Sequence, residues 1–299
     1  MGNIYLTNMI QRNFILPTGN ETNALEKFIY LSQIHQAMSV KLQTEFYRRS
    51  RKIDAEGNGN TMGALYWQLN DIWPTVSWSS IEFGGKWKML HYYAQKMFDN
   101  VLVDVYCDEN NLKVVLTRDD HEEEMLFNVT IFVYDWRLNK PVWQTEVSYL
   151  SQPFSSETIY EHDLKEILAS SSCDFVNNCL VYVQAFNKNA SIERDNFLLL
   201  ASVAESPISK SVKIVQTILQ PIHVNELTKF QINFEAYNGV APFVWIDIDP
   251  AYKIHGLFSE NGFMLLNKRT VWFQTMSSNV NSSTLAEALR VTSLMDFYR

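Results

Sequence analysis

One stretch of this chain, residues 61–98, constrains the fold more than any other: TMGALYWQLNDIWPTVSWSSIEFGGKWKMLHYYAQKMF. Its first part, residues 62–69, is mostly apolar and leaves no solvated face. This pattern predicts a strand that is buried on both sides, as in a parallel sheet or barrel. Pro74 then ends any regular pairing. Beyond Gly84, apolar residues recur at intervals of three and four, which predicts a helix over residues 86–98. They are Trp87, Leu90, Ala94 and Met97.

Polar side chains gather where the predicted strand ends. Gln68, Asn70 and Asp71 lie there, and Trp67 and Trp73 bracket them. In βα barrels the loop after a strand carries substrate binding and chemistry. Polar groups beside aromatic rings suit a sugar or another polyol. The alternative is that Asn70 and Asp71 only hold the following loop in place, and the residues alone leave both interpretations open.

The preceding segment contains the clearest helical pattern in the chain. We expect a helix over residues 21–52, with Asn23 and Glu26 as its cap. Its predicted apolar face consists of Leu31, Ile34, Met38, Leu42 and Phe46. Together with the polar loop 54–60, the predicted strand and the second helix, this makes one and a half βα units in about 100 residues, a fragment of an α/β domain.

From Val101 onward, short runs typical of β-strands follow one another. The first group lies at residues 101–105, 112–117, 126–134, 180–186 and 196–203, with a short helix at 163–169. The second group lies at residues 212–219, 229–237, 243–248, 262–266, 270–275 and 289–293, after a linker at 204–211. These runs predict two β-sandwiches. The expected domains are therefore residues 1–100, 101–205 and 206–299, in an α/β plus all-β chain.

The charge of the chain argues against a nucleic-acid partner, because a formal net charge of −8 offers no basic surface for phosphate. The one basic cluster, residues 48–52, lies where the last turn of a helix is expected, and cations are favoured there by the helix dipole. No apolar run approaches the roughly 20 residues of a membrane span. The first residues lack the charged and apolar regions of a signal peptide.

Three cysteines are present, and two of them, Cys173 and Cys179, share a hydrophilic loop that a disulfide could close. No histidine lies near them, so neither a metal site nor a cofactor is predicted. Four Asn-x-Ser/Thr sequons are candidate glycosylation sites, although a chain this rich in Asn contains roughly three by chance. They begin at Asn20, Asn128, Asn189 and Asn281.

Several segments resemble the β-mannosidases of glycoside hydrolase family two, particularly the animal lysosomal type. The resemblance is densest in GALYWQLNDIWP and SWSSIEFGGKWKMLHYYA, both within residues 61–98. Further similar segments are TEFYRRSR, APFVWIDI, FSENGFMLL and RVTSLMDFY, so the resemblance extends over essentially the whole chain.

This resemblance implies the last one to two βα units of a (β/α)8 barrel followed by two Ig-like β-sandwich domains. It places residues 62–70 as the eighth barrel strand, and Trp67 as the floor of the sugar subsite, supported by Asn70 and Asp71. The implied activity is retaining hydrolysis of terminal β-linked mannose in oligosaccharides of glycoproteins, in the lysosome or secretory pathway. The implied partners are a β-mannoside oligosaccharide and the N-terminal domains of the full-length enzyme.

Retaining hydrolysis uses two carboxyl groups about 5 Å apart, one as nucleophile and one as acid/base. In the family these are glutamates on earlier barrel strands, and no matching motif occurs in this sequence. The chain is therefore expected to be inactive alone. Two alternatives are a non-catalytic carbohydrate-binding or protein-interaction module, and an enzyme with a new site built on Asp71 and Glu82.

Overall fold

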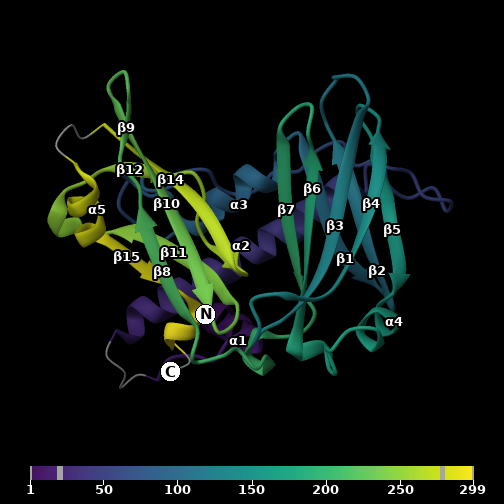
Figure 1. Cartoon of the computed structure of the whole chain (residues 1–299), viewed down its shortest axis with the longest axis horizontal. Coiled ribbons are helices and arrows are strands. Elements are labelled where there is room, and N and C mark those ends of the chain that lie inside the picture. Colours follow the sequence, from purple (N-terminus) through teal and green to yellow (C-terminus); the bar gives the residue numbers. More distant parts are fainter. Residues whose placement is uncertain (1, 19–22, 277–279, 298–299) are drawn as a thin grey trace. The chain divides into compact units, whose positions relative to one another are not determined.

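The computed structural model describes residues 2–18, 23–276 and 280–297 (Figure 1). The chain divides into two compact units. The first consists of Met1–Asp135 with Pro141–Ser206, and the second consists of Trp136–Lys140 with Pro207–Arg299. The helical segment before residue 100 and the first group of strands lie together in the first unit.

The first unit contains four α-helices and seven strands within its described residues. The helices are α1 (Gly2–Asn13), α2 (Ala24–Arg49), α3 (Met89–Met97) and α4 (Leu164–Ala169). The strands are β1 (Val101–Asp108), β2 (Asn111–Arg118), β3 (Met125–Asp135), β4 (Pro141–Ser151), β5 (Ser156–Asp163), β6 (Cys179–Asn187) and β7 (Ile192–Leu199). They form two antiparallel sheets, β1-β2-β5 and β4-β3-β6-β7, which share one hydrophobic core. Strands β4 and β5 were not predicted.

The core of this sandwich follows from alternation along its strands. In β3, the side chains of Phe127, Val129, Ile131 and Val133 are fully buried, whereas the intervening side chains are exposed or half-buried. The pleat points successive side chains to opposite faces, so one face of β3 packs into the core. This confirms the alternating pattern predicted from the sequence.

The second unit is also built from antiparallel strands and has one α-helix in its described part. The strands are β8 (Lys213–Ile218), β9 (Ile222–Val224), β10 (Leu227–Tyr237), β11 (Ala241–Ile248), β12 (Gly256–Phe258), β13 (Phe263–Leu265), β14 (Lys268–Thr275) and β15 (Leu289–Thr292), and the helix is α5 (Ser282–Ala288). One sheet has the order β12-β14-β10-β8, with β9 paired to β10, and the other has the order β13-β11-β15. All six strands predicted here are present; β9 and β12 were missed.

The predicted helix 21–52 is confirmed as α2, but its cap and its buried face differ from the prediction. Asn23 has a left-handed backbone (φ 63°) and its side chain makes no capping hydrogen bond. Leu31 and Ile34 are buried as expected, but Leu42 and Phe46 are exposed. The second half of the helix instead buries a polar stripe, namely Lys41, Thr44, Glu45 and Arg48.

That polar stripe is buried because the sandwich supplies partners for it. Lys41 Nζ lies 2.7 Å from Glu45 Oε2. Asn196 Nδ2 donates to Glu45 Oε1 and to the carbonyl oxygen of Val103, both at 2.8 Å. Burial is the main cause that raises the pKa of Glu45 to about 7; nearby Asp104 raises it further and Lys41 opposes the rise. A titratable ion pair therefore lies in the contact between α2 and the sandwich.

The basic cluster at the end of α2 pairs with carboxylates of the same sandwich. The pairs are Arg48–Asp119, Arg49–Asp104, Arg51–Asp119 and Lys52–Glu157. Arg48 Nη1 also donates to the carbonyl oxygen of Met97 at 2.8 Å, which ties the end of α2 to the end of α3.

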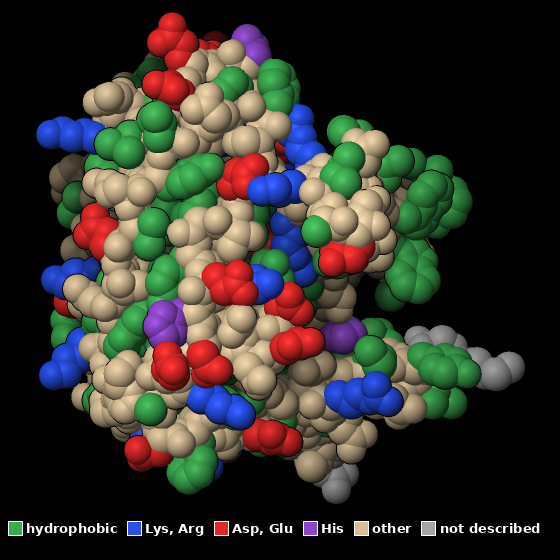
Figure 2. Space-filling model, turned by 90° about the vertical axis from the view of Figure 1, so that its right-hand side faces the viewer, with side chains coloured by type: hydrophobic (Ala, Val, Ile, Leu, Met, Phe, Trp, Pro, Cys, Tyr) green, Lys and Arg blue, Asp and Glu red, His purple; other side chains and the backbone are tan. Residues whose placement is uncertain are grey.

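Figure 2 shows that Lys and Arg side chains are interspersed with Asp and Glu on the visible face, and that hydrophobic side chains gather in one projecting area.

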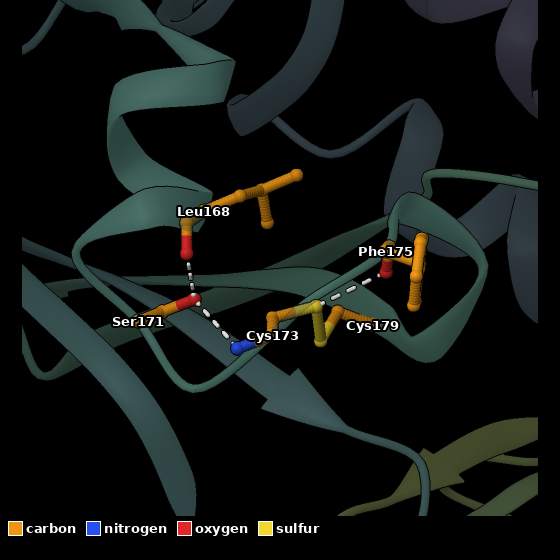
Figure 3. The surroundings of a disulfide bond; sticks show 5 residues. All are labelled: Leu168, Ser171, Cys173, Phe175 and Cys179. Carbon is orange, nitrogen blue, oxygen red and sulfur yellow. Dashed lines mark hydrogen bonds between the residues drawn. A yellow bond between two sulfur atoms is a disulfide. The ribbon is translucent and has the colours of Figure 1, made fainter.

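Cys173 and Cys179 are joined by a disulfide that closes the loop between α4 and β6 (Figure 3). Both half-cystines are buried and belong to the sandwich core. Ser171 Oγ donates to the carbonyl oxygen of Leu168 at 2.8 Å and accepts from the backbone N–H of Cys173 at 3.1 Å. The loop is thus held by the bridge at its base and by Ser171 at its start.

Replacing both bridged cysteines with serine is expected to lower the free energy of unfolding of the first unit by about 2 kcal/mol, because a short closed loop restricts the unfolded chain. Urea denaturation followed by circular dichroism measures this change. Cys107 has a free thiol, and Cys107→Ser serves as the control, with an expected change below about 0.5 kcal/mol. An equal loss in both variants would contradict a stabilising role for the bridge.

Candidate functional site

The prediction of a buried strand at residues 62–69 is wrong for this chain. The segment has no regular secondary structure, and several of its large apolar side chains are exposed, with Met62 at 73%, Leu65 at 101% and Leu69 at 55%, whereas Tyr66 is half-buried against α3. A strand that is buried on both sides needs hydrogen-bonded neighbours at both edges. Among the described residues, the pairing near it is limited to the isolated bridges Asn70↔Ile81 and Ile81↔Trp87, and to backbone hydrogen bonds from Ser80 and Ile81 to the carbonyl oxygens of Gln68 and Leu69.

The two tryptophans of the predicted sugar site both present their side chains to solvent. Trp67 is 78% exposed and Trp73 is 60% exposed, and the peptide bond between Trp67 and Gln68 is cis. Asn70 is also exposed, and its side-chain amide donates to the carbonyl oxygen of Asp71 at 3.4 Å. The residues chosen from the sequence thus lie on one irregular segment of seven residues.

Asp71 differs from its neighbours because its side chain is buried and fully engaged. Ser79 Oγ donates to Asp71 Oδ2 at 2.6 Å, and Ser77 Oγ donates to Oδ1. Lys88 Nζ lies 3.5 Å from Oδ2 and donates to Ser79 Oγ at 2.8 Å. The hydrogen bonds from Ser77 and Ser79, followed by the charge of Lys88, hold the pKa of Asp71 below its ordinary value. Asp71 is therefore ionised and holds the loop 71–80 closed.

A second polar cluster joins Ser80 to Tyr66 and His91. Ser80 Oγ lies 2.9 Å from Tyr66 OH and 3.1 Å from His91 Nδ1. Burial lowers the pKa of His91, which favours the neutral imidazole. Ser80 is fully buried and also bonds to the carbonyl oxygen of Leu69. Because no substrate reaches a buried hydroxyl, this Ser–His contact is structural. Ser80 lies 14 positions after Tyr66 and 11 positions before His91, and neither spacing is a recognisable sequence motif.

Contacts with α2 hold the loop from the other side. Gln36 Nε2 donates to the carbonyl oxygen of Trp78 at 2.9 Å, and Gln33 Oε1 accepts from the backbone N–H of Met89 at 3.0 Å. The first residue of α3 and the middle of the loop are therefore both attached to α2. Leu90, Ala94 and Met97 of α3 are buried as the sequence predicts.

The contacts of Asp71 and Glu82 do not support the alternative that these two residues form a new catalytic pair. Both oxygens of Asp71 accept hydrogen bonds within the loop, so neither is available as a nucleophile. Glu82 lies in a turn, in which its backbone N–H donates to the carbonyl oxygen of Lys86 and its carbonyl oxygen accepts from Gly85 N–H. A retaining hydrolase needs one protonated and one nucleophilic carboxyl facing the same bond.

Three sequon asparagines lie on the surface of the described chain. Asn128 Oδ1 accepts from Ser148 Oγ at 2.9 Å, and Asn189 is exposed after β6. Asn281 caps α5, and its Oδ1 accepts from the backbone N–H of Thr284 at 2.9 Å. Asn20 lies outside the described residues.

Within the described ranges, no group of three or more His, Cys, Asp or Glu side chains is arranged to hold a metal ion. Among the helices described by the structure, none is long and apolar enough to cross a membrane.

Known families and solved structures show which class of protein this chain resembles. An Ig-fold domain family, Ig_mannosidase, matches residues 212–297, which covers most of the second unit. The fold of the chain resembles the beta-D-mannosidase of Dictyoglomus thermophilum (TM-score 0.79, 21% identity, 98% of this chain and 32% of that chain). It also resembles an exo-chitosanase of Amycolatopsis orientalis (TM-score 0.67, 14% identity, 96% of this chain and 35% of that chain). Enzymes with different substrates therefore share this fold.

Relatives found by sequence similarity identify the protein family within that class. The beta-mannosidase of Bos taurus is 35% identical over 302 residues, and that of Mus musculus is 34% identical over 301 residues. Each alignment covers 99% of this chain and 33% of the relative. A probable beta-mannosidase of Caenorhabditis elegans is 32% identical over 82% of this chain and 26% of its own length. The chain is a homologue of the beta-mannosidases and spans about a third of the length of these relatives.

Proposed function

We propose that this chain is the C-terminal part of a retaining β-mannosidase that hydrolyses terminal β-linked mannose in glycoprotein oligosaccharides, in the lysosome or secretory pathway. The observation that carries the proposal is the identity of about a third to animal beta-mannosidases along 99% of this chain. The proposed activity is the one stated in the names of those relatives. The oligosaccharide class and the compartment rest on the resemblance of the chain to the lysosomal type.

In this proposal, residues 1–100 complete a catalytic (β/α)8 barrel whose other strands belong to the upstream part of a longer protein. The exposed apolar side chains of residues 62–83 support this, because surface patches of this kind mark docking sites. Large examples are Met62, Leu65, Leu69, Ile72, Val76, Trp78 and Phe83. The two sandwiches of residues 101–205 and 206–299 are proposed as the C-terminal β domains of that longer protein.

Trp67 is proposed as the floor of the mannose subsite, because the family resemblance places it there and its ring is exposed next to the closed loop. Asn70 and Trp73 lie beside it, and Asp71 acts as a positioning residue that fixes loop 71–80 through Ser77 and Ser79. The nucleophilic and acid/base glutamates are proposed to come from the upstream part. The chain by itself is then inactive, because it contains neither of these two glutamates.

The proposal is tested by comparing the native protein with the isolated chain. An antibody against residues 111–150 is used to capture the native protein from its source, and residues 1–299 are expressed separately. We expect the captured protein to release 4-nitrophenol from 4-nitrophenyl β-D-mannoside, and the separate chain to show no release above background. An inactive captured protein, or a separate chain as active as the captured one, would contradict the proposal.

A further inference from the structure

The larger sheet of the second unit has one face that packs into the core and one face that is open to solvent. Figure 1 shows β8, β10 and β14 side by side in this sheet. Along β10, buried and half-buried residues alternate without interruption from Leu227 to Ala236. The buried set includes Phe230, Ile232 and Phe234. The side chains between them therefore point outward.

An aromatic ring lies in the middle of the open face. Trp272 of β14 is 36% exposed and pairs directly with Gln231 of β10. Next along the strands, Thr270 pairs with Asn233, which in turn pairs with Thr217 of β8. Side chains at paired positions lie on the same face of a sheet. An indole, two amides and two hydroxyl groups thus form one continuous strip.

Hydrogen bonds within the strip hold its amides in defined orientations. Gln231 Nε2 donates to Asn233 Oδ1 at 3.1 Å, and Thr270 Oγ1 donates to the same oxygen at 2.9 Å. The side-chain carbonyl oxygen of Gln231 and the NH₂ group of Asn233 are not used in these two bonds. They remain as one acceptor and one donor on the open face of the sheet, where Gln231 is paired with Trp272.

The centre of the strip carries no charge. The charged side chains of this face lie toward the ends of the paired region, where Lys268 forms an ion pair with Glu235 at 2.9 Å and Lys229 pairs with Gln274. Because acidic and basic ligands need compensating charge, an uncharged strip favours a neutral ligand. Its half-buried amides favour a ligand with many hydroxyl groups over an apolar protein surface.

We propose that this open sheet face, formed by Trp272, Gln231, Asn233, Thr270 and Thr217, is a secondary binding site for a neutral, extended oligosaccharide. A pyranose ring stacks its C–H face on the indole of Trp272, as apolar faces of amphipathic groups do on aromatic rings. The hydroxyl groups of the stacked sugar and of its neighbour bond to Gln231 and Asn233. The site holds a glycan without acting on it, so it is independent of the proposed hydrolysis.

The test measures binding of β-1,4-mannohexaose to residues 1–299 by ligand-observed NMR, with cellohexaose as a second probe. We expect saturable binding of at least one probe. Trp272→Ala should weaken it roughly tenfold or more through loss of the stacking surface, and Trp272→Phe should retain most of it. Tyr252→Ala is the matched control, because Tyr252 is an exposed aromatic residue of the second unit outside this sheet; it should leave binding unchanged.

A further variant separates this site from the proposed mannose subsite. Trp67→Ala removes the aromatic ring of the proposed mannose subsite in the first unit, and the binding that remains in this variant should be lost when Trp272→Ala is added. The inference is overturned if the wild-type chain binds neither probe at saturating concentration, or if Trp272→Ala binds as tightly as the wild type. Circular dichroism of each variant shows that the sheet is intact. Loss of binding in Trp67→Ala alone would also overturn it, and would assign the glycan to the first unit.

Discussion

Replacing Lys41 with methionine is expected to lower the free energy of unfolding of the first unit by about 3–5 kcal/mol at pH 8. The cause is that Glu45 would be left without its cation in a fully buried position, and an uncompensated buried charge is among the costliest defects in a folded protein. Methionine preserves the volume of the lysine stem, so packing contributes little to the loss. Urea denaturation at fixed pH measures the change.

The same variant should lose much less stability at pH 5. Burial raises the pKa of Glu45 to about 7 in the folded state, so its carboxyl is protonated there at pH 5. For a group whose folded pKa is raised, the contribution to stability is fully present below the unfolded pKa, here 4.5, and is lost as the pH rises through about 7. The contact between α2 and the sandwich is therefore expected to be stronger in acidic solution.

Two controls accompany this prediction. Lys113→Met removes a lysine from the more exposed pairs with Asp108 and Glu161, and should cost at most about 1 kcal/mol. Glu45→Gln removes the titrating group, so the stability of this variant should vary less between pH 5 and pH 8 than that of the wild type. Equal losses for Lys41→Met at the two pH values would show that Glu45 does not titrate in this range.

Replacing Trp67 with alanine in the native full-length protein is expected to lower kcat/KM for 4-nitrophenyl β-D-mannoside roughly 10- to 150-fold. The magnitude follows from losing the burial of one large aromatic surface against the sugar, about 1.5–3 kcal/mol. Because the chemistry is proposed to reside on upstream glutamates, the pH profile of the residual activity should stay unchanged. Initial rates over a range of substrate concentrations and pH values measure both.

The matched control for Trp67 is Phe186→Ala, which removes an exposed aromatic side chain from β6. It should leave kcat/KM unchanged within about twofold, the effect expected of a surface change away from the site. Asp71→Asn tests the positioning role, since it removes the charge that accepts from Ser77 and Ser79. This variant should lose activity and also become more susceptible to chymotrypsin within residues 72–80. Lost activity with unchanged proteolysis would contradict a role in holding the loop.

The sequence predicts helices and strands well where burial follows a simple period. Strand β3 alternates apolar and polar residues, and α3 buries Leu90, Ala94 and Met97 at helical spacing. Strand β4 was not predicted, although half-buried and exposed side chains alternate along it. Its inward-facing residues Trp143 and Tyr149 pack against the core without being fully buried, and β4 pairs with β3 along its length.

The buried face of α2 was mispredicted for a related reason. Apolar spacing placed Leu42 and Phe46 inside, but Lys41, Glu45 and Arg48 are buried instead. Charged residues are buried when partners compensate them, and the partners here lie far away in the chain, at Asn196 and Asp119. A helical period contains no information about such distant partners.

Some residues of the candidate site could be chosen from the sequence, and others could not. The position of Asp71 after an apolar run marked it as notable, whereas Ser77, Ser79 and Lys88 were not chosen because their roles arise only when the loop closes. The strand predicted at residues 62–69 needs neighbours that the nearby described chain does not supply. Its apolar composition indicates a buried environment that the isolated chain lacks.

The most direct test of the central claim is the mass and sequence of the native protein captured by an antibody against residues 111–150. If the chain is the C-terminal part of a β-mannosidase, the captured protein is far larger than 34.8 kDa and its upstream sequence contains the two catalytic glutamates of a barrel. A native protein of about 34.8 kDa, with no upstream sequence, would contradict the claim and leave a binding module as the function of the chain.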